Sequence, residues 1–244
     1  MEIRKVEVYI LHPFLLLFFS PPSLEWQVMN NKPYSHKEKP LTWQIAKEII
    51  SNRIATHVNG SSVQSIAKKV REIHEEQGGL PAEEDLKEIV NQGLRYLSMY
   101  GKANQVSSDI WTVPQYPDQE IFGSGKHWVY LYYFSADKKK AKSDSMSPYD
   151  DEDDLFWPCK IGKTDKDPED RVKALTRGVP VPPRIGLLLR TDEHSALEDA
   201  IHGILTVRGR HLKELQGKEW FLTNPREVTK IYDFIIRLNP YLGL

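Results

Sequence analysis

The 244-residue sequence contains a single cysteine, Cys159, which excludes an internal disulfide framework. It also lacks the CxxC and HxxxH spacings that are typical of local zinc sites. Neither sign of charge is in excess, because 33 Lys+Arg stand against 34 Asp+Glu, a net charge of −1. Binding to nucleic acid would therefore have to rest on local charge. With one cysteine, a reducing, cytoplasmic (intracellular) setting is the default expectation.

A long hydrophobic run is also missing. The longest apolar stretch, residues 9–19, follows Arg4 and Lys5 and is interrupted by His12 and Pro13. It is shorter than the roughly 20 residues of a membrane-spanning helix, so stable membrane association is not expected. No small-x-small cleavage site follows it. Residues 1–40 are predicted to be a leader or tail: disordered, a buried strand, a degenerate signal, or translated sequence ahead of a true start at Met29.

Residues 41–113 have the pattern of three helices followed by two strands. Apolar residues recur at helical spacing from residue 41, from a cap at Ser61 or Ser62, and from Pro81, and strands are predicted at 102–106 and 109–113. This order resembles a winged-helix module, which places a helix in a DNA groove. Eight Lys+Arg against nine Asp+Glu give the segment a charge of −1. Positioning of DNA and a packing or protein-interaction role both remain open.

Residues 114–126 contain two prolines and two glycines without periodicity, which predicts a linker. A second domain is expected at 127–240. It begins with an aromatic strand at 128–134, and a second strand follows at 156–162. Between them, residues 135–155 contain a block of lysines followed by a block of acidic residues, which predicts a mobile charged insertion. An acidic metal cluster is the alternative for this insertion.

The rest of the second domain alternates helices and strands. Asp167 and Pro168 predict a capped helix that ends at Gly178. A strand is expected at 184–189, a helix at 193–207, a short strand at 220–222 and a helix at 225–238. Glu198 and His202 are four residues apart and share one helix face. The whole chain is therefore predicted to be α+β.

The second domain also carries a set of short motifs in a fixed order. They are Tyr130 in the first strand, Lys160-Ile161-Gly162, Arg171, Glu198-x-x-x-His202 and Glu219-Trp220-Phe221. Their order and placement over residues 128–236 resemble the GIY-YIG nuclease superfamily, in particular its phage-type branch with K-I-G and E-W-F motifs. The resemblance implies a small α/β domain with a three-stranded antiparallel sheet flanked by helices. It also implies a divalent-metal-dependent endonuclease that hydrolyses DNA phosphodiester bonds.

The same resemblance implies roles for four catalytic residues. Glu198 would hold the metal, Mg²⁺ or Mn²⁺, with waters and phosphate oxygens completing the coordination. Arg171 would neutralise charge on the phosphate in the transition state. Tyr130 would help to activate water, and His202 would shuttle a proton or hold the phosphate. Each has a structural alternative: Glu198 could be an unpaired surface residue of its helix, Tyr130 and His202 could pack in the core, and Arg171 could form an ion pair with Glu198.

Four further residues are predicted to contact DNA: Lys160, Gly162, Lys163 and Arg177. Gly162 would permit a turn or a close approach of phosphate, while Glu219 and Trp220 would support the site. Residues 160–230 hold 14 Lys+Arg and 11 Asp+Glu, a balance of +3, whereas residues 114–159 hold 5 and 9, a balance of −4. The positive balance falls on the motif-bearing segment, as phosphate binding requires.

Two motifs depart from the family pattern. The first motif reads Trp128-Val129-Tyr130 instead of G-I-Y, and Lys160 replaces the tyrosine of the second motif. In relatives that use that tyrosine to activate water, its loss weakens or redirects catalysis. Two alternatives to an active endonuclease therefore stay open: a catalytically inactive DNA-binding protein of the same fold, and a protein-interaction scaffold.

Overall fold

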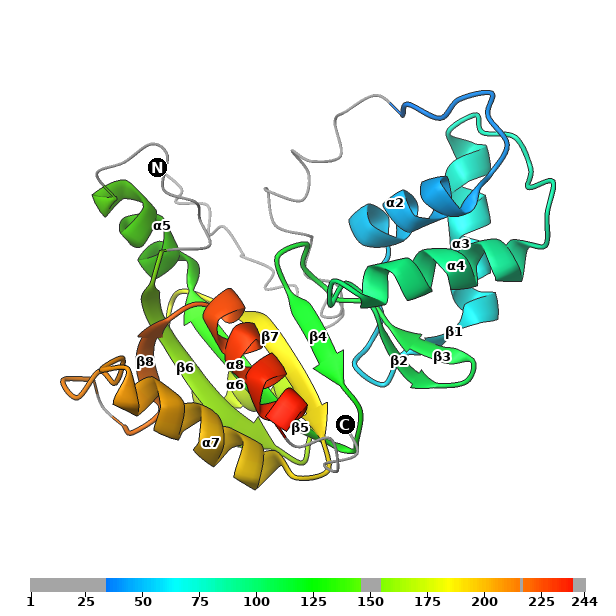
Figure 1. Ribbon diagram of the computed structural model, residues 1–244. Helices are drawn as coiled ribbons and strands as arrows, with labels where there is room; N and C mark the ends of the chain where they lie inside the picture. Colours follow the sequence, from blue (N-terminus) through cyan, green and yellow to red (C-terminus); the bar gives the residue numbers. More distant parts are fainter. Residues whose placement is uncertain (1–33, 146–154, 216, 239–244) are drawn as a thin grey trace, which may run out of the picture. The chain divides into compact units, whose positions relative to one another are not determined.

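The computed structural model describes residues 34–145, 155–215 and 217–238 (Figure 1). Residues 1–33, which are most of the expected leader, and 146–154 of the expected charged insertion lie outside the described residues. None of the helices within the described ranges is long and apolar enough to cross a membrane.

The first part of the chain folds into a helical module with a small sheet. Its helices are α2 (Trp43–Arg53), α3 (Val63–Glu76) and α4 (Leu86–Ser98). Three strands, β1 (Ser61–Ser62), β2 (Asn104–Ser107) and β3 (Ile110–Thr112), pair antiparallel in the order β1-β3-β2. The sequence predicted only the last two strands. The two serines of β1 were missed because their strand conformation depends on pairing with β3, nearly 50 residues away.

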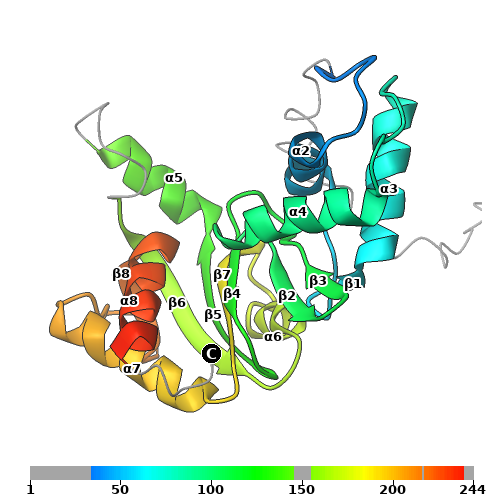
Figure 2. The same cartoon turned by 45° about the vertical axis from the view of Figure 1, so that its right-hand side comes forward.

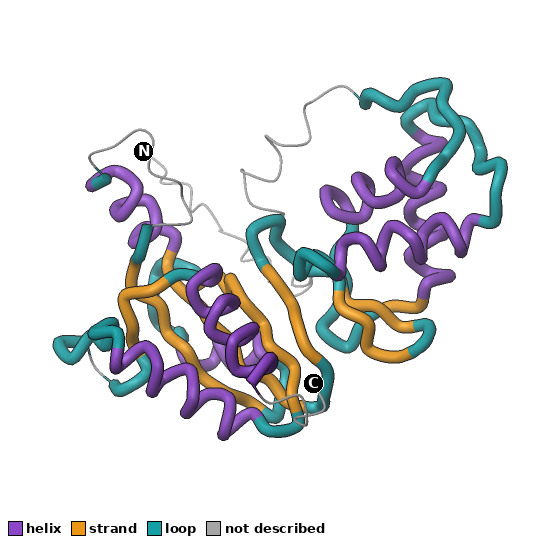
Figure 3. The backbone as a smooth tube through the Cα atoms, viewed as in Figure 1, coloured by secondary structure: helices purple, strands orange, loops and turns teal. Residues whose placement is uncertain are grey.

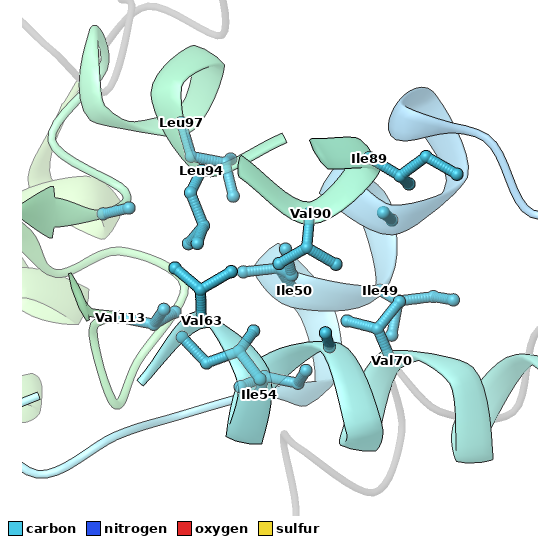
Figure 4. Close-up of a cluster of buried hydrophobic side chains, with 14 of the residues drawn as sticks. Ile49, Ile50, Ile54, Val63, Val70, Ile89, Val90, Leu94, Leu97 and Val113 are labelled. Atoms are coloured by element: carbon cyan, nitrogen blue, oxygen red, sulfur yellow. The ribbon is translucent and has the colours of Figure 1, made fainter. Parts of the chain in front are cut away.

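The apolar faces of the three helices form the core of this module (Figure 4). Side chains from α2, α3 and α4 interdigitate there, as their helical spacing predicted. Among those drawn are Ile49, Ile50, Val63, Val70, Val90 and Leu94. All of them are at most 2% exposed.

Helix α4 begins later than the sequence predicted. Pro81 was expected at its first turn, but the helix starts at Leu86 after the cap residue Asp85. The Asp85 carboxylate accepts a hydrogen bond from the backbone N–H of Glu88 at 2.9 Å. An aspartate that satisfies a free N–H of the first turn outweighs the weaker preference for proline there.

Replacing Asp85 by alanine is expected to lower the free energy of unfolding by about 1 kcal/mol, because the Glu88 N–H loses its acceptor. Urea unfolding of the full chain measures the change. Asp85→Asn keeps the acceptor oxygen and should retain most of the stability, and Glu84→Ala changes an exposed neighbour as a control. Equal loss in the asparagine and alanine variants would contradict a capping role.

The second part of the chain is built on a five-stranded sheet rather than the predicted three-stranded one. Its strands are β4 (Glu120–Gly123), β5 (His127–Phe134), β6 (Trp157–Thr164), β7 (Pro183–Thr191) and β8 (Trp220–Thr223). Their order is β4-β7-β5-β6-β8, and β4 pairs parallel to β7 while the other neighbours pair antiparallel. The central strands β7, β5 and β6 correspond to the three-stranded antiparallel sheet that was expected.

Strand β4 lies within residues 114–126, which the sequence predicted to be a linker. Four residues between prolines and glycines are too few to show a period. The strand is fixed instead by its pairing with β7, where Glu120 lies opposite Leu187. Residues 135–144, expected to be part of a mobile insertion, form helix α5 (Ser135–Asp144). Its Ala141 packs against the core of the sheet.

Helices cover both faces of this sheet (Figures 2 and 3). Helices α7 (His194–Val207) and α8 (Pro225–Leu238) pack on one face, against Val129, Leu131 and Tyr133 of β5. Helix α6 (Pro168–Leu175) covers the other, where its Val172 joins the cluster of Trp128, Tyr130 and Tyr132. Alternate residues of β5 therefore face different layers, as expected for a strand buried on both sides.

Candidate functional site

Several of the predicted site residues lie around the end of β6 that extends beyond β8. Strand β8 pairs only with the Trp157–Lys160 half of β6. Beyond it, the Ile161 N–H still donates to the Glu219 carbonyl. From Gly162 to Thr164, β6 pairs with β5 on one side and with no described strand on the other. Groups from both faces can reach this edge: Tyr130 and α6 from one side, and Lys163 and α7 from the other.

Gly162 makes room for the ring of Tyr130. The two residues lie directly opposite each other in the β5–β6 pair. A Cβ atom built on Gly162 would lie 2.7 Å from the Tyr130 hydroxyl oxygen and 2.9 Å from its Cζ. Gly162 lies within β6, so it does not form a turn, which was one of the two roles predicted for it. Its role is steric: only a residue without a side chain lets the tyrosine lie flat across β6 toward the edge.

Tyr130 is buried near the guanidinium of Arg171 on helix α6. Its side chain is 2% exposed, and this burial raises the pKa of the phenol, while a hydrogen bond and the charge of Arg171 partly offset the effect. The carboxylates of Glu219 and Glu198 raise the pKa further, which places both within electrostatic range of the hydroxyl. Tyr130 therefore stays protonated near neutral pH and is suited to donate a hydrogen bond rather than to accept a proton.

On the other face of the sheet, Lys163 and Glu198 form an ion pair. The Lys163 ammonium lies 2.9 Å from Oε2 of Glu198, whose side chain is 8% exposed. This hydrogen bond is the main cause that raises the pKa of Lys163 above its usual value. The alternative partner considered for Glu198 was Arg171, but the ion pair observed is with Lys163. The sheet register explains this, since Lys163 points to the α7 side while Gly162 points to the α6 side.

Lys160, which stands where the family motif has a tyrosine, forms an ion pair with a different carboxylate. Lys160 Nζ lies 3.2 Å from Oε2 of Glu219, and its cross-strand neighbour is Tyr132. Burial raises the pKa of Tyr132 to about 12. Trp220 packs edge-on against Tyr132, with ring centroids 5.9 Å apart, and stacks on Phe134. Trp220 thus supports the aromatic layer next to the site, and Glu219 orders Lys160.

The two remaining predicted residues lie differently. His202 is half-buried, and its Nε2 lies 3.2 Å from the Ile161 carbonyl oxygen. Its ring packs against that of Phe221, with the ring centroids 4.8 Å apart. These contacts brace α7 against β6 and favour the packing role considered for His202. Arg177 lies exposed in the loop after α6. Among the described residues, no hydrogen bond or ion pair joins it to the other site residues.

Lys163 pairs with the nearly buried Glu198, Lys160 pairs with Glu219, and Arg171 lies near Tyr130, so cations able to attract a phosphate lie on both faces of this end of β6. Arg171, Lys163 and Lys160 come from a helix and a strand that are packed on buried residues, so their backbones are held in place. The pairing of Lys163 with Glu198 was not expected from the sequence. The alternation of faces along β6, which sets Lys163 apart from Gly162, is the signal that could have indicated it.

Comparison with curated proteins and with solved structures found no match. A family model does match the part of the chain that carries this site. The matched residues are the same ones over which the sequence resembles the GIY-YIG nucleases. Membership of that superfamily remains a prediction. Residues 128–236, which contain every site residue described above, match the T5orf172 domain.

Proposed function

We propose that this protein is a divalent-metal-dependent endonuclease that hydrolyses DNA phosphodiester bonds. The observation that supports this most is the Lys163–Glu198 pair on one face of the sheet, with Arg171 near Tyr130 on the other face, at the same end of β6. A lysine paired with a single carboxylate, and an arginine on the neighbouring helix, are groups that can bind and polarise a phosphate.

The chemistry of Glu198 fits a bound Mg²⁺ or Mn²⁺ ion. Its carboxylate is an oxygen donor of the kind that Mg²⁺ prefers, and its nearly buried side chain already holds one cation, the Lys163 ammonium, at 2.9 Å. In this proposal Glu198 holds the metal and Lys163 turns to a phosphate oxygen. When bound, the metal supplies charge neutralisation at the scissile phosphate.

The other groups act through their own geometry. Arg171 is exposed on the first turns of α6 and approaches the Tyr130 hydroxyl, so its remaining N–H groups are available for phosphate oxygens. Tyr130, protonated near neutral pH, orients Arg171 and donates to the phosphate or to water. Lys160 and Glu219 flank the site and set its local charge. His202 and Trp220 keep α7 and the aromatic layer in place.

The helical module at residues 41–113 is proposed to position the DNA. Support comes from the order of its elements, in which three helices with one intervening strand precede a two-stranded ribbon, as in winged-helix modules. Helix α3 also carries three exposed basic residues, Lys68, Lys69 and Arg71. Lys68 lies 3.9 Å from Glu72, so part of this charge is balanced within the helix itself.

A second candidate function is DNA binding without cleavage, and one observation favours it. Lys160 occupies the position of the second-motif tyrosine and is paired with Glu219. Neither neighbouring tyrosine replaces the missing group, because burial raises the pKa of both Tyr130 and Tyr132. A protein with these cations but no group able to activate water would bind phosphates and leave them intact.

Incubating the purified full-length protein with supercoiled plasmid separates the two functions. The endonuclease proposal predicts nicked or linear DNA with Mg²⁺ or Mn²⁺ and none with a chelator. A gel shift that weakens steeply with salt, without any cleavage, would select the binding function. A protein that neither cuts nor shifts DNA would contradict both and leave the interaction-scaffold alternative.

A further inference from the structure

Three metal-ligating side chains from separate segments converge at the end of the sheet. His127 is the first residue of β5, Asp165 directly follows β6, and His194 is the first residue of α7. One ligand atom from each lies within 4.8 Å of the other two. Oδ1 of Asp165 is 3.1 Å from Nδ1 of His127 and 2.9 Å from Nε2 of His194.

These distances fit ligands that surround one ion. Zinc binds imidazole nitrogen and carboxylate oxygen at about 2.0–2.2 Å, so two ligands of a tetrahedral site are about 3.3 Å apart. The two nitrogen–oxygen separations lie close to that value. Two nitrogens and one oxygen also form a donor set that suits Zn²⁺ better than Mg²⁺, which prefers oxygen ligands alone.

An unsatisfied atom indicates that a cation belongs between these groups. Nδ1 of His127 is inaccessible to solvent and makes no hydrogen bond among the described residues, although it lies 3.1 Å from the carboxylate. The contact therefore has the distance of an ion pair without the alignment of a hydrogen bond. A nitrogen lone pair and a carboxylate oxygen repel each other unless a proton or a metal lies between them.

Protonation of both histidines is a poorer explanation than one shared ion. Their ring centroids are 4.7 Å apart, so two imidazolium rings would repel each other beside one exposed carboxylate. One divalent ion satisfies both nitrogens and the oxygen together. We propose that His127, Asp165 and His194 bind one Zn²⁺ ion, at a site separate from the Glu198 carboxylate.

The location of this site gives the ion a structural consequence. His194 precedes Glu198 by one turn of α7, and Asp165 follows Lys163 by two residues. Zinc would tie the end of β6 to the start of α7, the two elements that carry the Lys163–Glu198 pair. Three protein ligands leave a coordination position open, and the Asp165 side chain is 67% exposed, so solvent or a small anion completes the shell. The inference does not depend on the proposed nuclease activity.

Calorimetric titration of the full-length, chelator-treated protein with Zn²⁺ tests the site, using a chain without an added histidine tag. We expect one Zn²⁺ per chain and a rise in melting temperature of about 5 °C at saturating metal. Asp165→Ala and His194→Ala should each weaken binding at least about 100-fold, since loss of a ligand exceeds the 10–100-fold cost of losing an outer partner. Because Asp165 is exposed, its variant should fold.

His36→Ala is the matched control. Nε2 of His36 lies 2.9 Å from the Glu48 carboxylate, the same distance as His194 from Asp165, but His36 is not one of the three residues of the cluster. Its removal should leave zinc affinity unchanged. Co²⁺ should bind in place of Zn²⁺ and give visible absorption that the Asp165 variant lacks. Absence of zinc binding, full affinity in either ligand variant, or displacement of zinc by equimolar Mg²⁺ would overturn the proposal.

Discussion

Replacing Glu198 by glutamine is expected to lower metal-dependent plasmid nicking by at least about 100-fold. Glutamine keeps the shape of the side chain and an oxygen that can accept from Lys163, but it removes the negative charge that holds the metal. The expected loss is therefore in the cleavage rate rather than in folding. Single-turnover nicking at several Mg²⁺ concentrations measures it, and the remaining activity should need more metal.

Asp199→Asn is the matched control for this variant. Asp199 is the exposed neighbour of Glu198 on α7, and the change removes the same charge one residue away from the site. It should cut at the wild-type rate. Arg171→Ala should be as inactive as Glu198→Gln because both act on the same phosphate, while its metal requirement stays unchanged. Wild-type cleavage by Glu198→Gln would show that the nuclease is a contaminant or that the site lies elsewhere.

Gly162→Ala is expected to lower the free energy of unfolding by about 1–3 kcal/mol, the usual cost of overpacking a buried site. The new methyl group would lie 2.7 Å from the Tyr130 hydroxyl oxygen. Tyr130 cannot easily turn aside, because its ring is 2% exposed and packed between β6 and α6. Urea unfolding measures the loss.

Two further variants test whether the cause is this one contact. Gly203→Ala on α7 adds the same methyl group where nothing lies within 4 Å. It should be neutral or stabilising by about 0.5–1 kcal/mol, the helical preference of alanine over glycine. Tyr130→Phe removes the nearest atom and should recover part of the stability of Gly162→Ala. A Gly162→Ala protein as stable as the wild type would contradict the steric role.

Much of the fold was predictable because its signals are local. The cap at Asp167 followed by Pro168 set the start of α6, and the apolar spacing of Leu197, Ile201 and Leu205 set α7. The central strands β5, β6 and β7 are long enough for their apolar and aromatic composition to indicate strands. The two short strands β1 and β4 were not predictable, because each is defined by a partner far along the chain.

The candidate site was predictable as a set of residues but not as a set of contacts. The motif order pointed to Tyr130, Gly162, Arg171 and Glu198, and the structure brings Arg171 to Tyr130 and packs Tyr130 over Gly162. Which cation meets Glu198 was open. Strand alternation directs Lys163 toward α7, so Lys163 pairs with Glu198. Arg171 instead lies near Tyr130. The resemblance alone could not make that distinction.

The sequence by itself determined the helices other than α5, and the central strands, because caps and apolar periods act over a few neighbouring positions. The order of its motifs gave the residue types of the site. Only the tertiary structure decided which side chains meet. The contact of Lys163 with Glu198 and the convergence of His127, Asp165 and His194 join residues 29 to 67 positions apart. Such contacts depend on sheet register and on where a helix crosses the sheet, and no local spacing encodes either one.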